Sequence, residues 1–157
     1  MRYAGRTLAA ALVSAAATVA VAIFSAYRLS SAPVRGRLAG PDPIGSIASA
    51  AALVVALVAF YRLGRSIAAP SPRPAIVAGL VGGALTGLAG GAAQSVALSD
   101  YLSAVLAGYA LPPEFLAFAL GVYVVAATCA AAVVAAALTY VGWSRARRQT
   151  AGQPPTG

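Results

Sequence analysis

Four long apolar segments dominate the pattern of hydrophobic and polar positions along the chain. Arginines and prolines separate them, and they cover about residues 7–27, 44–61, 75–99 and 115–143. A helix needs about 20 largely apolar residues to cross the hydrocarbon core of a bilayer, which is about 30 Å thick. Each segment is close to or above that length. We therefore predict an all-α integral membrane protein in which four transmembrane helices form a bundle.

A shorter amphipathic pattern separates the third and fourth segments. Its apolar positions recur at the spacing of one helix face. They are Tyr101, Leu102, Val105, Leu106 and Tyr109. Ser99 or Asp100 is suited to cap the N-terminus of this helix, which is too short to cross a bilayer. We predict a short interfacial or re-entrant helix between the third and fourth spans.

The two ends of the chain differ in composition. Residues 1–144 hold all four apolar segments and are predicted to form one membrane domain. Residues 145–157 form a basic tail that we expect to be disordered and cytoplasmic. The first segment has a basic start like that of a cleaved signal peptide, but its apolar stretch exceeds the usual ~7–15 residues. We therefore interpret it as a transmembrane helix.

Glycine recurs at every fourth position of the third segment. The glycine stripe comprises Gly79, Gly83, Gly87 and Gly91, and a second row beside it comprises Gly82, Thr86 and Gly90. In a water-soluble helix each glycine is less favourable than alanine by about 1 kcal/mol. In a bilayer, small residues instead allow two helix backbones to approach closely. We predict that this face is a groove for helix packing.

Several partners fit this groove. Within the chain, the fourth segment contains an alanine-rich stretch at residues 126–137, and the first segment is also rich in small residues. A copy of the protein or a different subunit would fit equally well. The groove is also compatible with a pore lining, where absent side chains leave room for water or a small solute.

The distribution of arginine predicts the orientation of the chain. With the N-terminus in the cytoplasm, the inner segments hold Arg2, Arg6, Arg62, Arg65, Arg73, Arg145, Arg147 and Arg148, whereas the outer ones hold Arg28, Arg35 and Arg37. Cytoplasmic loops carry an excess of basic residues. We therefore expect a multi-pass protein of the cell membrane with both termini in the cytoplasm, where its arginines contact anionic lipid headgroups.

Composition agrees with this interpretation and excludes other classes of protein. Hydrophobic residues make up 61% of the chain and charged residues 9%, far below the ~25% of a typical soluble domain. The net charge of +8 comes from arginines that flank the spans, so we expect no nucleic-acid partner. The abundance of alanine and the lack of lysine are typical of a GC-rich prokaryotic genome.

The sequence offers little for catalysis or for binding a cofactor. It has no histidine and one cysteine, Cys129, which we expect to be a small buried residue. Motifs for nucleotides, zinc or hydrolases are missing, so we predict no enzyme activity, cofactor or metal. Asp100 and Glu114 flank the outer loop and could form an acid pair, but a helix cap and a helix-dipole contact explain each one separately.

Three residues are candidates for a polar contact inside the bundle. Gln94 lies near the outer end of the third span, Thr86 lies beside the glycine stripe, and Tyr123 lies about two turns into the fourth span. We expect Gln94 to form an interhelical hydrogen bond or to contact a solute. Tyr123 is expected to pack against a neighbour or to direct its hydroxyl into a polar interior.

These observations leave three hypotheses for function. The first is a non-catalytic membrane protein whose glycine stripe mediates helix packing or subunit assembly, in a homo-oligomer or with another subunit. The second is a small oligomeric channel or facilitator whose path is lined by Gln94, Thr86 and Tyr123. The third is a membrane enzyme that uses Asp100 and Glu114 at its outer face.

Overall fold

The structure, a computed structural model, describes residues 3–31, 43–108 and 112–151. Over these ranges the chain forms four helices, α1 (Ala4–Ser31), α2 (Pro43–Ser66), α3 (Arg73–Gly108) and α4 (Pro113–Ala151). Each one contains one of the predicted apolar segments and is long and apolar enough to span a membrane. The all-helical fold and the four candidate spans are therefore confirmed, and they are compatible with a multi-pass membrane protein.

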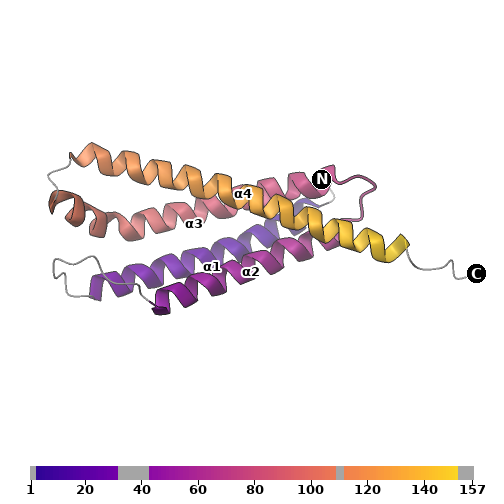
Figure 1. Cartoon of the computed structure of the whole chain (residues 1–157), viewed down its shortest axis with the longest axis horizontal. Helices are drawn as coiled ribbons and strands as arrows, with labels where there is room; N and C mark the ends of the chain where they lie inside the picture. The colour runs from indigo at the N-terminus through magenta and orange to yellow at the C-terminus, as the bar shows by residue number, and fades with distance from the viewer. Residues whose placement is uncertain (1–2, 32–42, 109–111, 152–157) are drawn as a thin grey trace, which may run out of the picture.

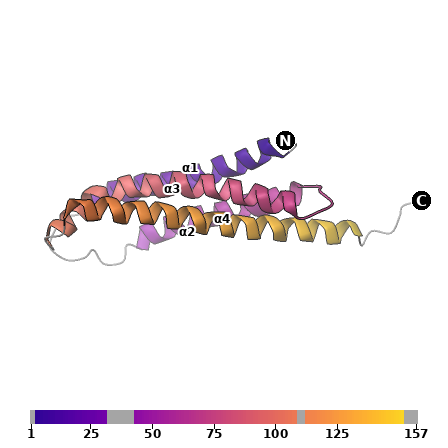
Figure 2. The same ribbon diagram turned by 90° about the horizontal axis from the view of Figure 1, so that it is seen from above.

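The four helices form two layers that run along a common long axis (Figures 1 and 2). One layer contains α1 and α2, the other contains α3 and α4, and α1 packs on α3 while α2 packs on α4. Figure 1 shows the layers drawing together toward the end where both chain termini lie, here called the convergent end. They separate toward the opposite end, here called the divergent end.

The buried core lies toward the convergent end. Its members come from all four helices and the α2–α3 connection: Ala10, Phe60, Leu63, Ile67, Ala75, Ala78 and Ala135. Trp143 packs against this core, and its indole Nε1 donates a hydrogen bond to the carbonyl of Ala69, 3.0 Å away. The Arg147 guanidinium lies over the same indole ring, 5.4 Å from its centroid. These contacts hold the end of α4 against the α2–α3 connection.

Large apolar side chains cover the outward faces of the helices. Ile47 and Phe118 are each 68% exposed and Val96 is 76% exposed. A soluble protein rarely leaves such extensive apolar surface in contact with water. Contact with lipid acyl chains avoids the free-energy cost of exposing apolar side chains to water. The surface therefore agrees with the membrane assignment.

Residues 100–108 continue α3, and the structure shows no separate short helix there. The Ser99 hydroxyl donates to the carbonyl of Val96 at 2.8 Å, one turn back in the same helix, so it does not cap a new helix. Neither glycine nor proline interrupts the chain between Gly91 and Gly108, which leaves α3 free to continue. Its last turns bend away from the axis of the central part (Figure 1). Tyr109 lies outside the described residues.

The C-terminal tail is also more regular than expected. The structure describes residues 145–151 as the last turns of α4, whereas the composition of this segment suggested disorder. Arg147 donates to the carbonyl of Pro70, and Arg65 donates to Oε1 of Gln149 at 3.0 Å. These tertiary contacts extend the helix beyond its apolar part. Residues 152–157, like Arg35 and Arg37, lie outside the described part of the chain.

Candidate functional site

The glycine stripe of α3 faces α4 of the same chain. A Cβ atom added to Gly79 would lie 2.6 Å from Cα of Ala136. One added to Gly83 would lie 2.8 Å from Cα of Ala132, and one added to Gly87 would lie 2.6 Å from Cα of Thr128. Real Cβ atoms do not approach other atoms so closely, so no larger side chain fits between these backbones. At Gly91 the nearest approach is 3.4 Å, an ordinary van der Waals contact.

The second row of small residues faces the other layer of the bundle. A Cβ atom on Gly82 would lie 2.8 Å from the Phe60 ring of α2, and one on Gly90 would lie 2.8 Å from Oγ1 of Thr18 in α1. The two rows therefore have different neighbours within the chain. Because α3 carries small residues on both faces, it contacts α4 on one side and the α1–α2 layer on the other.

A further close approach joins α2 to α4 through two glycines that belong to no repeating pattern in the sequence. A Cβ atom on Gly64 would lie 2.7 Å from Cα of Thr139, and one on Gly142 would lie 3.1 Å from the backbone nitrogen of Arg65. Thr139 is fully buried, and its hydroxyl donates to the carbonyl of Ala135 in its own helix. Gly64 and Gly142 thus bring the backbones of α2 and α4 together near the convergent end.

A cavity of about 460 Å³ lies between the four helices on the divergent side of the core. Phe60, Ala135 and Leu138 separate it from the convergent end. Five polar side chains line it, namely Thr18, Ser49, Thr86, Gln94 and Tyr123. Gly87, Gly90 and Gly91 add bare backbone to its wall, so the glycines also contribute to its volume. All three polar residues expected in the bundle interior therefore line one cavity, in which Thr86 is buried, Gln94 is half-buried and Tyr123 is 45% exposed.

Hydrogen bonding divides these five polar residues into two groups. Three hydroxyls donate to carbonyls of their own helices: Thr18 to Ala15 at 2.9 Å, Ser49 to Gly45 at 2.9 Å and Thr86 to Gly82 at 3.0 Å. The amide of Gln94 and the hydroxyl of Tyr123 have no hydrogen-bond partner among the described residues. An amide offers two donors and one acceptor, and a phenol offers one of each. These two side chains are therefore the groups available to a bound molecule.

The electrostatic character of the cavity is simple. Alanine, valine, leucine and glycine make up most of its wall, and none of the residues that line it carries a charge. A charged solute would lose its hydration here without gaining a counter-ion, which is costly in a medium of low polarity. The cavity is therefore suited to a neutral molecule that is mostly apolar and forms a few hydrogen bonds.

The residues considered for catalysis lie apart from this cavity. Asp100 is exposed within α3 and Glu114 is exposed in the first turn of α4, and no described hydrogen bond or ion pair joins them. Glu114 has the position expected for a helix-dipole contact, whereas Asp100 is not at a helix start. Cys129 is exposed on α4, not buried as we expected.

Sequence reasoning could identify some members of the site but not the site itself. Thr18 and Ser49 gave no signal, since isolated hydroxyl residues are common in apolar helices and often bond to their own backbone. Their place in the wall depends on how the two layers separate.

Within the described ranges, no group of three or more potential metal ligands lies close enough together to hold an ion. No protein-family model, curated protein or solved structure matches the chain.

Proposed function

We propose that this chain is a non-catalytic, multi-pass membrane protein that holds a small neutral solute in the cavity between its four helices. The observation that carries the proposal is the Gln94 amide, which lines the cavity without a hydrogen-bond partner among the described residues. Of the hypotheses from the sequence, the proposal is closest to the oligomeric channel or facilitator, but it assigns the solute to a cavity within one chain. An oligomeric pore is not required.

The energetics of an unpaired amide support this proposal. A polar group in apolar surroundings costs several kcal/mol unless a partner satisfies it. A solute with both a donor and an acceptor can satisfy Gln94 and Tyr123, the two polar side chains of the cavity wall that lack partners among the described residues. A cavity of this size with apolar walls and a few polar groups is typical of small-molecule sites.

In this proposal the glycine stripe serves helix packing inside the chain. The close contacts of Gly79, Gly83 and Gly87 with α4 support an internal role. Docking of another subunit on the same face would require α4 to move away. The stripe then supports the cavity indirectly, because it fixes the position of α4, which carries Tyr123.

The distribution of charge supports a location in the cell membrane with both termini in the cytoplasm. Apart from Arg28, every arginine in the described part of the chain lies toward the convergent end. Both described acids, Asp100 and Glu114, lie toward the divergent end. The positive-inside rule then makes the convergent end cytoplasmic, and the cavity lies nearer the outer face.

A thermal-shift comparison of indole with naphthalene tests the proposal. Indole has an N–H donor that Gln94 or Tyr123 can accept, whereas naphthalene has a similar shape without it. A ligand at ten times its dissociation constant stabilises a protein by about 1.4 kcal/mol, or about 3–5 °C for a chain of this length. We expect indole to raise the Tm of the purified protein more than naphthalene does, and Gln94→Leu to remove the difference.

Two matched variants test whether indole binds in the cavity. Ala130→Phe places a ring in the cavity wall, whereas Ala126→Phe adds the same ring one turn away on α4, outside the wall. The stabilisation by indole should disappear in Ala130→Phe and persist in Ala126→Phe. Equal Tm shifts in these two variants would mean that indole binds elsewhere and would contradict the proposal.

A further inference from the structure

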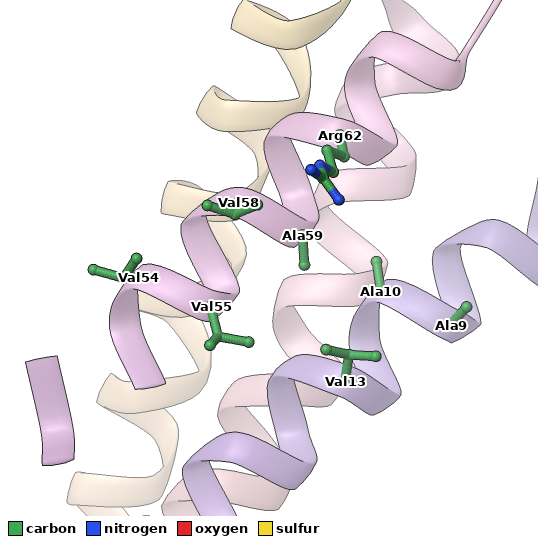
Figure 3. A pocket seen from close by; sticks show the side chains of 8 residues that line it. All are labelled: Ala9, Ala10, Val13, Val54, Val55, Val58, Ala59 and Arg62. Atoms are coloured by element: carbon green, nitrogen blue, oxygen red, sulfur yellow. The ribbon is translucent and has the colours of Figure 1, made fainter. Parts of the chain in front are cut away.

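A second apolar groove lies on the outer surface of the α1–α2 layer (Figure 3). Its volume is about 450 Å³, and it shares no residue with the central cavity. Seven apolar residues and one arginine line it: Ala9, Ala10 and Val13 from α1, and Val54, Val55, Val58, Ala59 and Arg62 from α2. Figure 3 shows Arg62 at one end of the groove and the valines along the rest.

Four described arginines of the convergent end, Arg62, Arg73, Arg145 and Arg148, make no hydrogen bond with a described residue, and of these only Arg62 lines the groove. Arg6 donates to the carbonyl of Ser66 at 2.8 Å, Arg65 donates to Gln149, and Arg147 donates to the carbonyl of Pro70. Arg62 is exposed and makes no hydrogen bond or ion pair with any described residue. Its guanidinium is therefore available to an anion from outside the chain.

The position of Arg62 along α2 matches the level of lipid headgroups. It lies one turn before the end of the helix at Ser66, where the span meets the membrane surface. From Arg62 the groove extends back to Val54, about 12 Å along the helix at 1.5 Å per residue. This part lies within the hydrocarbon region. The groove thus has a cationic end at headgroup depth and an apolar length at acyl-chain depth.

We propose that this groove binds one anionic phospholipid, with its phosphate on Arg62 and an acyl chain along Val13, Val55 and Val58. A guanidinium presents a planar set of N–H donors that matches two phosphate oxygens. The described carboxylates, Asp100 and Glu114, are at the divergent end and do not compete for Arg62. This site requires that the chain spans a membrane but does not depend on a solute in the central cavity.

Native mass spectrometry of the full chain with defined lipids tests this site. The protein is titrated in detergent with equal amounts of phosphatidylglycerol and phosphatidylcholine. We expect one phosphatidylglycerol per chain to be retained with about fivefold preference, which corresponds to about 1 kcal/mol for one basic residue at a membrane surface. Arg62→Gln should remove this preference. Arg148→Gln removes the same charge from an exposed position outside the groove and should retain it.

A third variant tests whether lipid binding requires the groove as well as the charge of Arg62. Val13→Trp fills the groove from an exposed position and leaves Arg62 in place, so it should also lose the retained phosphatidylglycerol. Each variant is included only if its Tm is within a few degrees of the wild-type value, which excludes unfolding as the cause. The proposal is overturned if Arg62→Gln and Arg148→Gln retain the lipid equally, if Val13→Trp binds it as the wild type does, or if wild type shows no preference between the two lipids.

Discussion

Replacing Gly83 with leucine is expected to prevent α3 and α4 from packing and to cause one of the largest losses of stability in the chain. A Cβ atom at this position would lie 2.8 Å from Cα of Ala132 and 2.7 Å from Cβ of Ala135. Because one of these atoms belongs to the backbone of α4, no change of side-chain rotamer relieves the overlap. The helices must move apart along the whole stripe. We expect a loss of about 3 kcal/mol or more, the upper part of the range for overpacked sites.

Gly121→Leu is the matched control for this substitution. Gly121 lies in α4, and a Cβ atom added there would meet nothing within 4 Å. Leucine is also the better helix former by up to about 1 kcal/mol, so this variant should be as stable as the wild type or more so. Equilibrium unfolding in mixed detergent, followed by circular dichroism, measures the stability of both variants. Equal stability of Gly83→Leu and Gly121→Leu would show that α3 and α4 do not pack through the stripe.

Gly64→Leu should cause a loss of similar size through a different pair of helices. A Cβ atom at Gly64 would lie 2.7 Å from Cα and 2.8 Å from the carbonyl carbon of Thr139 in α4. Because Thr139 is fully buried next to the core, displacing α2 there also opens the core to lipid or water. We expect the end of α2 to separate from α4, with a cost of about 3 kcal/mol.

The effect of Gly64→Leu is measured as the distance between α2 and α4 as well as by the stability of the protein. Spin labels on exposed positions of α2 and α4 near the convergent end should report a longer and broader distance distribution in Gly64→Leu than in the wild type. Gly5→Leu is the control, because a Cβ atom at Gly5 would meet nothing within 4 Å. An unchanged distance distribution in Gly64→Leu, together with unchanged stability, would contradict the backbone contact between α2 and α4.

Repeated glycines identify a packing face from the sequence, whereas isolated glycines such as Gly64 do not. Four glycines at a spacing of four residues mark a face of α3 from sequence alone. Gly64 and Gly142 are isolated in their helices and gave no such signal. Their importance depends on the register between α2 and α4, since each glycine lies opposite the backbone of the other helix. Register is a property of the packed pair, which a single segment does not specify.

The helix ends were predictable only where hydrophobicity determines them. The apolar spans were located correctly, but α3 and α4 continue beyond them, to Gly108 and Ala151. In α4 the extension depends on contacts of Arg147 and Gln149 with other parts of the chain. In α3 the amphipathic pattern after Ser99 correctly indicated a helix, but nothing in it specified whether that helix is separate or continuous.

Some residues that line the candidate site were predictable from the sequence, whereas the cavity itself was not. Gln94, Thr86 and Tyr123 were identified because polar groups are rare inside apolar spans. Their common cavity lies where the two layers separate, with Phe60 and Leu138 at the end next to the core. A sequence pattern reports which residues face inward but does not report the distance between layers.

Native mass spectrometry of the protein extracted from its own host in a mild detergent shows whether the cavity holds a solute. We expect a single chain that carries a small molecule in addition to any lipid, and Gln94→Leu extracted in the same way should lack that molecule. Arg62→Gln provides the internal control, because it should lose phospholipid and keep the small molecule. A wild-type chain with no such molecule, or one that retains it equally in Gln94→Leu, would contradict the claim that the cavity is a solute site.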